Sequence, residues 1–120
     1  MTIGPPRDGG RRIDLHSHTV FSDGQLTPEE LLAHARSRQV AVLGVTDHDT
    51  VDGLPRALAA ADDVTVVPGI ELSSALDGLD LHMLGYFIDH TDAALLERLE
   101  GFRGERRQRA VAIMARLREL

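Results

Sequence analysis

The stretch Val40–Asp49, VAVLGVTDHD, joins an unbroken apolar run to a charged end. A run of small and branched apolar residues of this length is typical of a strand in a parallel sheet covered on both faces. The run closes on Asp47, His48 and Asp49, side chains that can bind a proton or a metal ion. The stretch therefore predicts a central strand of an α/β fold that ends in a polar site.

Similar elements lie on both sides of this strand. Thr27 followed by Pro28 and two glutamates is a strong helix start, and Asp77-Gly78 is a typical hairpin turn. We expect strands at 11–18 and 64–72, helices at 26–39 and 54–63, and a fourth strand after the turn, within residues 79–87. The order strand, helix, strand, helix, strand predicts an α/β chain with parallel strands and helices outside them.

From Thr91 onward the pattern is helical and rich in arginine. Two segments, 91–102 and 103–120, have helical spacing, and the second carries an apolar stripe. We expect the stripe to face a core, with a partner interface as the alternative. Its members are Ala110, Ile113, Met114 and Leu117. A closed barrel of eight strand-helix units needs on the order of 250 residues, so we expect this chain to be the front part of a larger domain.

Composition narrows the class of protein. The 120 residues are 42% hydrophobic, enough for a core, with no cysteine and no lysine. No apolar run is long enough to cross a membrane, and no secretory signal is evident, so we expect a cytoplasmic protein. The net charge of −6 argues against a general nucleic-acid-binding surface. Residues 1–11 are rich in glycine, proline and arginine and are expected to form a disordered arm.

Potential metal ligands fall at or near the ends of the expected strands. His16 and His18 alternate on one side of the first strand, so both imidazoles can reach one cation. A carboxylate such as Glu71 on a buried strand is costly unless it is paired. The candidate ligands are His16, His18, Asp23, His48, Glu71 and His82. Imidazole and carboxylate without thiolate suit Zn, Mn or Fe(II), and six ligands indicate at least two ions bridged by a carboxylate.

Several of these residues also have ordinary structural interpretations. A lone histidine such as His82 is more often hydrogen-bonded than metal-bound, and Ser-Asp-Gly around Asp23 is a common turn. Asp14 shares a strand face with His16 and is expected to orient a ligand. Asp47 and Asp49 either do the same or cap the turn that follows. His34 and His90 are expected at the surface.

Four segments together resemble a known family. DLHSHTVFSDG, VTDHDT, PGIELS and LHMLGY are similar, in order and spacing, to the opening motifs of the PHP (polymerase and histidinol phosphatase) domain. The similarity is strongest to small metal-dependent phosphoesterases that hydrolyse nucleoside monophosphates or bisphosphates and trim RNA 5′ ends. It covers residues 12–120, which would form the N-terminal portion of the domain.

This resemblance implies the front of a distorted (β/α)7 barrel with two to three metal ions, Mn, Zn or Fe. His16, His18, Asp23, His48, Glu71 and His82 match the family's ligands, with Glu71 as the bridging carboxylate. The metals would bind the phosphate of a nucleotide or RNA end and activate a water molecule for attack. The family completes its site with a further His and a late Asp-x-His that this chain lacks, so a missing C-terminal half or self-association is expected to fill the gap.

Two other functions remain open at the level of sequence. Amidohydrolases that cleave C–N bonds share the H-x-H pair, but many of them use a carbamylated lysine, and this sequence has no lysine. The other alternative is a catalytically incomplete domain that binds metal or serves a structural role without turnover.

Overall fold

The computed structural model describes residues 10–119. The chain divides into two units, residues up to 88 and residues from 89 onward, and each unit is described here by itself. The N-terminal arm expected at residues 1–11 falls mostly on residues 1–9, which lie outside the described residues.

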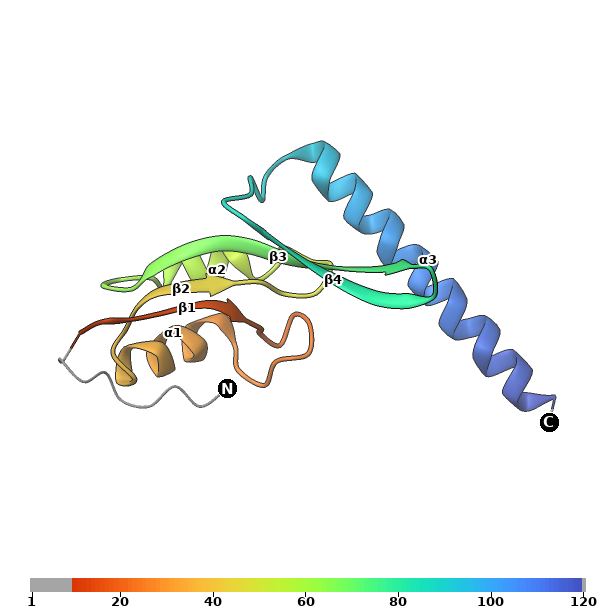
Figure 1. The fold of residues 1–120 in the computed structure, drawn as a ribbon, viewed down its shortest axis with the longest axis horizontal. Helices are drawn as coiled ribbons and strands as arrows, with labels where there is room; N and C mark the ends of the chain where they lie inside the picture. Colours follow the sequence, from red (N-terminus) through yellow and green to blue (C-terminus); the bar gives the residue numbers. More distant parts are fainter. Residues whose placement is uncertain (1–9, 120) are drawn as a thin grey trace. The chain divides into compact units, whose positions relative to one another are not determined.

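The first unit is built on a four-stranded sheet with the strand order β1-β2-β3-β4 (Figure 1). The strands are β1 (Arg12–Ser17), β2 (Val40–Val45), β3 (Thr65–Leu76) and β4 (Leu79–Tyr86). The first three strands run parallel, as the sequence predicts. β4 is antiparallel to β3, so the sheet is mixed and departs from an all-parallel arrangement at this last strand.

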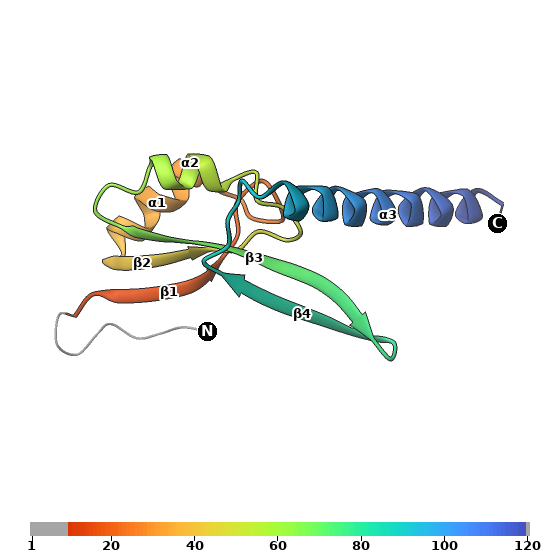
Figure 2. The same cartoon turned by 90° about the horizontal axis from the view of Figure 1, so that it is seen from above.

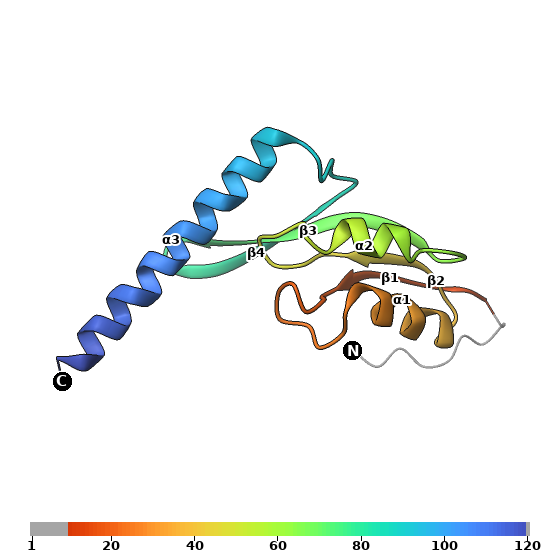
Figure 3. The same cartoon turned by 180° about the vertical axis from the view of Figure 1, so that it is seen from behind.

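Two helices, α1 (Pro28–Ser37) and α2 (Leu54–Ala59), pack on the same face of the sheet, as the view in Figure 2 and the reverse view in Figure 3 show. The start of α1 is a capping box. Thr27 Oγ1 accepts from the Glu30 N–H at 3.3 Å, and the Glu30 carboxylate accepts from the Thr27 N–H at 2.9 Å. Buried apolar side chains from both helices and the sheet form the core: Leu32, Ala35, Leu43, Val45, Leu54, Ala57, Val67 and Ile70.

The hairpin between β3 and β4 turns at the expected residues. Asp77 and Gly78 both have positive φ, 51° and 79°, which are the values a two-residue type I′ turn requires. The turn sets the register that pairs Ser73 with His82 and Glu71 with Leu84. The hairpin therefore carries His82 back toward the end of the sheet where Glu71 lies.

Within the described part of the first unit, helices cover only one face of the sheet. Large apolar side chains on β1 and β4 are exposed. Ile13 is 62% exposed and Met83 is 58% exposed. The inner face of a curled sheet is covered by side chains from other strands of the barrel rather than by helices. An apolar run such as β2 therefore does not require a helix on each side.

The second unit contains one long helix, α3 (Ala93–Arg118). The two helical segments expected from the sequence are continuous, and Gly101 and Gly104 lie inside the helix without interrupting it. Asp92 caps the start by accepting from the Leu95 N–H at 2.8 Å. The expectation that the apolar stripe faces a core is wrong here, because Ile113, Met114 and Leu117 are all more than half exposed. No helix within residues 10–119 is long and apolar enough to span a membrane.

Candidate metal centre

The sheet and the loops that follow β1 and β2 bring all six candidate ligands together. Because β1, β2 and β3 are parallel neighbours, their carboxyl ends meet at one edge of the sheet. The chain beyond β2 continues the pairing, since His48 forms an isolated parallel bridge with Glu71. The resulting ligand sets, each with donor atoms within 4.8 Å of one another, are His16, His18 and Glu71; His18, Asp23 and His48; and His48, Glu71 and His82.

Glu71 lies at the centre of this cluster. Its Oε2 is 2.9 Å from His16 Nε2 and 3.1 Å from His18 Nε2. The same oxygen is 3.6 Å from His48 Nε2, while Oε1 is 3.5 Å from His82 Nδ1. One carboxylate thus faces four imidazoles, with a different oxygen turned toward His82 than toward the other three. Both oxygens of the Glu71 carboxylate are therefore directed toward imidazole nitrogens.

Asp23 extends the cluster on the side of His18 and His48. Its Oδ2 is 3.3 Å from His48 Nε2, and its Oδ1 is 3.5 Å from His18 Nδ1. Taken alone, the Ser-Asp-Gly turn is ordinary, yet the structure places its carboxylate against two of the histidines. The Asp23 side chain is 65% exposed, which leaves this side of the cluster open to solvent.

The electrostatics of Glu71 favour its charged form. Burial raises the pKa of its carboxyl group, since only 6% of the residue is exposed. The hydrogen bond with His16 and the charges of His48, His16 and His18 act in the opposite direction and outweigh burial. The net result is a pKa below the usual value of a glutamate. Glu71 is therefore an ionised carboxylate surrounded by imidazoles.

The donor set fits a group of divalent cations. His18 Nδ1 and His48 Nδ1 are buried and have no hydrogen-bond partner. His16 Nε2 and His18 Nε2 lie 3.0 Å apart, so both nitrogens can face one cation. Ligand atoms around a tetrahedral ion lie roughly 3.3 Å apart when each is about 2.0 Å from the metal. The observed separations of 2.9 to 3.6 Å bracket that spacing.

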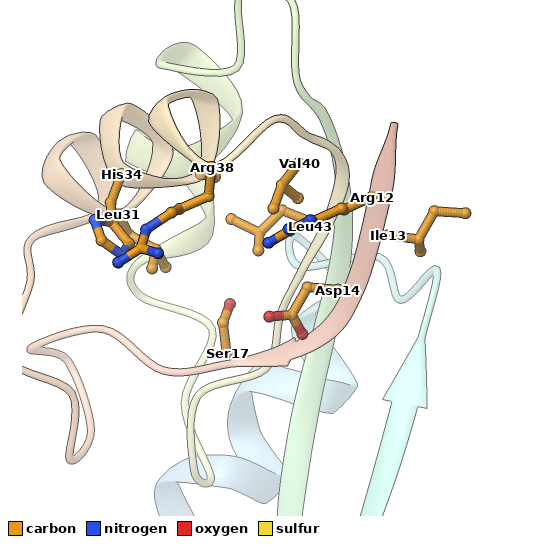
Figure 4. Close-up of a pocket in the computed structure, with 10 residues that line it drawn as sticks. Arg12, Ile13, Asp14, Ser17, Leu31, His34, Arg38, Val40 and Leu43 are labelled. Carbon is orange, nitrogen blue, oxygen red and sulfur yellow. The ribbon is translucent and has the colours of Figure 1, made fainter. Parts of the chain in front are cut away.

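Asp14, which was expected to orient a ligand ring, contacts the main chain instead. Its Oδ1 accepts from the His16 N–H at 3.1 Å. Figure 4 shows its carboxylate directed toward a cavity of about 500 Å³ that is lined by residues of α1, β1 and β2, among them Arg12, and by Arg38 after α1. His34 lines the same cavity, is exposed and belongs to none of the ligand sets, as expected.

Asp47 and Asp49 are both buried beside the cluster. Asp49 Oδ1 accepts from the Ser73 N–H at 3.1 Å, and the Asp49 N–H donates to the Glu71 carbonyl at 3.0 Å. Asp47 accepts three hydrogen bonds from Thr19 and Ser22. Both aspartates thus contact the segments that carry ligands, and neither belongs to a ligand set.

Sequence reasoning missed Thr19, Ser22 and Gly24 as parts of the site. Thr19 is fully buried, and its carbonyl accepts from the Ser22 and Gly24 N–H groups. A Cβ on Gly24 would lie 2.3 Å from the His18 carbonyl oxygen, so only glycine fits there. The turn composition Ser-Asp-Gly indicates a tight loop, but its contact with Asp47, more than twenty residues away, has no local signal.

Imidazoles and carboxylates gathered at the carboxyl ends of parallel strands, with helices outside, are typical of α/β metalloenzymes. The model of the PHP domain matches residues 14–113. The chain belongs to the PHP domain family, as the sequence motifs predict.

Relatives with assigned names agree with this placement. The chain is 38% identical over 108 residues to the 5′-3′ exoribonuclease Rnm of Escherichia coli, an alignment that covers 87% of this chain and 37% of the relative. It is 40% identical over 100 residues to the 3′,5′-nucleoside bisphosphate phosphatase of Chromobacterium violaceum, covering 82% of this chain and 35% of that protein. The chain thus spans little more than a third of the length of these relatives and corresponds to their N-terminal part.

Solved structures confirm the fold. A Chromobacterium violaceum protein described as an amidohydrolase, with bound sulfate and no metal, superposes with a TM-score of 0.78 at 39% identity, covering 83% of this chain and 36% of that one. A Bifidobacterium adolescentis protein ascribed to the metal-dependent phosphoesterases superposes with a TM-score of 0.77 at 30% identity, covering 88% and 37%. The expected front part of a PHP-type barrel is therefore confirmed.

Proposed function

We propose that residues 12–120 act as the N-terminal portion of a PHP domain that hydrolyses phosphate monoesters of nucleotides or RNA 5′ ends. The observation that supports this most is the contact of one buried carboxylate, Glu71, with four imidazoles from three other segments of the chain. The named relatives that act on RNA and on nucleoside bisphosphates support the substrate class.

The cluster would hold two to three divalent cations, of Mn, Zn or Fe. The ligands in this proposal are His16, His18, Asp23, His48, Glu71 and His82, grouped in the three sets described above. Each set shares a residue with another, so neighbouring ions would be coupled through common ligands. Divalent cations in such a site polarise a phosphoryl group and lower the pKa of the attacking water.

The chain's own residues would arrange this chemistry. Glu71, ionised and buried, would fix the spacing between neighbouring cations because both of its oxygens face imidazoles. His16 and His82 have side chains that are 48% exposed, and Asp23 is more exposed still. A phosphate ester would therefore approach from the side of these three residues, while Glu71 lies beneath them.

A second candidate function is metal binding without turnover. It is supported by the three ligand sets, which describe a metal site without by themselves requiring turnover. Cleavage of C–N bonds is a weaker candidate, because the sequence contains no lysine that could be carbamylated to bridge two metals. We also propose a cytoplasmic location, in keeping with the expectation from the sequence.

The test is a set of assays on the chain loaded with Mn²⁺ or Zn²⁺. The substrates are a general phosphomonoester, a nucleoside 3′,5′-bisphosphate and a short 5′-phosphorylated RNA. His16→Ala removes a ligand, and His34→Ala is the matched control because His34 is an exposed histidine outside the ligand sets. Turnover that is lost in His16→Ala and kept in His34→Ala supports the phosphoesterase.

Elemental analysis of the same preparations separates the remaining outcomes. Metal that copurifies with the wild type and His34→Ala but not with His16→Ala, without turnover of any ester, favours the incomplete metal-binding domain. A wild-type chain that retains no transition metal after exchange into metal-free buffer contradicts both functions.

A further inference from the structure

We infer that Asp47 is a positioning residue that holds the loop carrying His18 and Asp23 in the geometry that binds a cation. The inference rests on the proposed metal centre and deepens it. The loop in question comprises residues 19–24 and leads directly from His18 through Asp23. Its Ser-Asp-Gly composition indicates a tight turn, and contacts with residues far away in the sequence hold that turn against the rest of the fold.

Asp47 makes that contact through both carboxylate oxygens. Its Oδ1 accepts from the Thr19 N–H at 2.6 Å and from the Ser22 hydroxyl at 2.7 Å. Its Oδ2 accepts from the Thr19 hydroxyl at 2.7 Å. These are short bonds to an acceptor that is only 2% exposed, where an unsatisfied carboxylate would be costly. A loop displaced from Asp47 would lose all three.

The main chain of the loop connects the residues that Asp47 binds to the two ligands, His18 and Asp23. The Thr19 carbonyl accepts from the Gly24 N–H at 2.9 Å and from the Ser22 N–H at 3.1 Å, which closes the loop around Asp23. His18 immediately precedes Thr19, whose N–H is itself held by Asp47. Fixing Thr19 and Ser22 therefore fixes the backbone on both sides of the loop from which His18 and Asp23 project.

The main chain of Asp47 reaches a third ligand. Its carbonyl accepts from the Glu71 N–H at 3.0 Å, and His48 follows it in the sequence. Asp47 thus links the loop of residues 19–24 with β3 and with the segment after β2. Space for the carboxylate depends on Gly53, where a Cβ would lie 3.1 Å from Asp47 Oδ2. Through its carboxylate and its main chain, Asp47 therefore contacts or adjoins segments that supply four of the six ligands.

The experiment compares Co²⁺ binding, followed by the visible absorption bands of the bound ion, in wild type and Asp47→Asn. Asparagine keeps the volume of the side chain, but its NH₂ group takes the place of one acceptor oxygen and cannot accept from the Thr19 hydroxyl as Oδ2 does. We expect Co²⁺ affinity to fall 10–100-fold and the absorption spectrum to change, with the fold retained in urea unfolding. Asp63→Asn removes the same charge from an exposed position and should leave Co²⁺ binding unchanged.

A second variant covers the case in which Asp47→Asn does not fold. Ser22→Ala removes one of the three donors and leaves the buried carboxylate in place. We expect a few-fold loss of Co²⁺ affinity, together with faster amide hydrogen exchange at Thr19 and Gly24 in the metal-free protein. Loss of affinity combined with faster exchange in this loop supports positioning.

The results that overturn the inference differ from those that overturn the metal centre. Wild-type Co²⁺ affinity, within twofold, in a folded Asp47→Asn or Ser22→Ala variant shows that the loop needs no such support. Failure of the wild type itself to bind Co²⁺ contradicts the metal centre. In that case the exchange rates at Thr19 and Gly24 decide the role of Asp47, and unchanged rates in the variants overturn it.

Discussion

At the scale of single residues, Glu71 is expected to contribute more to metal binding than the other candidate carboxylate, Asp23. It is the only carboxylate within residues 10–119 that belongs to two of the ligand sets, whereas Asp23 belongs to one. Glu71 is also buried, so its removal leaves imidazoles facing one another without an intervening charge. A site with this organisation depends on its central acid more than on its peripheral one.

Glu71→Ala is therefore expected to cost more metal than Asp23→Ala. Loss of a ligand shared by two ions should exceed the 10–100-fold loss of affinity typical when an outer hydrogen-bond partner is removed. The measurement is metal content per chain and Zn²⁺ affinity by competition with a chelating dye. Equal losses in the two variants would show that Glu71 does not bridge.

At the scale of elements, the contact of β1 with β2 depends on Gly44. A Cβ at this position would lie 2.6 Å from the Leu15 carbonyl oxygen, a main-chain atom that cannot rotate away. The next residue along β1 is His16, so any shift of Leu15 moves a candidate ligand. The close approach of β1 and β2 at Gly44 therefore also determines the position of His16.

Gly44→Ala is expected to destabilise the chain by about 1–3 kcal/mol, the usual cost of overpacking, and to weaken metal binding. Urea unfolding and Zn²⁺ affinity measure the two effects. Gly101→Ala is the matched control, because open space surrounds Gly101 within α3. Alanine there should stabilise the helix by about 0.5–1 kcal/mol. A Gly44→Ala variant with wild-type stability would contradict the close approach.

The pairing of α1 with α2 rests partly on an ion pair at the surface. Arg56 donates to Glu29 through Nε at 2.8 Å and Nη2 at 2.7 Å. The hydrogen bond from Arg56 lowers the pKa of Glu29 to about 2, from 4.5. A depressed pKa in the folded state gives stability that is present above the unfolded value near 4.5. That stability is lost as the pH falls toward 2.

Arg56→Gln should return the pKa of Glu29 toward 4.5, as an NMR titration of its carboxyl carbon would show. Glu30 is an internal control, because its lowered pKa comes from the backbone hydrogen bond with Thr27. The pKa of Glu30 should stay low in the same variant. A Glu29 pKa that remains near 2 would show that the ion pair is not the cause.

Much of the arrangement of elements could be predicted, and for identifiable reasons. The helix start at Thr27 and the hairpin turn at Asp77-Gly78 depend on local backbone chemistry, which a sequence displays. The positions of His16, His18 and His48 follow from one rule, that parallel strands end at the same edge of a sheet, whereas His82 is placed by the register of the hairpin between β3 and β4. The bonds of Asp47 to Thr19 and Ser22 could not be predicted, since 28 and 25 residues separate the partners. Exposure of the stripe on α3 was also missed, because helical periodicity does not say what covers an apolar face.

For the molecule as a whole, a metal ion bound by the candidate ligands would link several strands. They come from β1, the segments after β1 and β2, β3 and β4, so a bound ion joins segments that span the first unit. Ions that bind the folded chain and not the unfolded chain stabilise it by mass action. The first unit should therefore be more stable with metal than without it.

Zn²⁺ at 100 times its dissociation constant should add about 2.7 kcal/mol to the free energy of unfolding. For a chain of this size that corresponds to a rise in Tm of roughly 10 °C or more. Thermal unfolding followed by circular dichroism, with and without a chelator, measures the rise. Glu71→Ala should abolish it, and a rise of equal size in that variant would place the stabilising ion elsewhere.

One hydrogen bond between distant residues has a consequence for how the chain folds during synthesis. The Tyr86 hydroxyl donates to the Leu15 carbonyl at 2.9 Å, joining residues 71 positions apart, and His82 lies in the same late strand. During synthesis the first two histidines leave the ribosome long before the last strand does. The six candidate ligands can therefore come together only after β4 has been synthesised, and the nascent chain would bind metal at this site only from that point on.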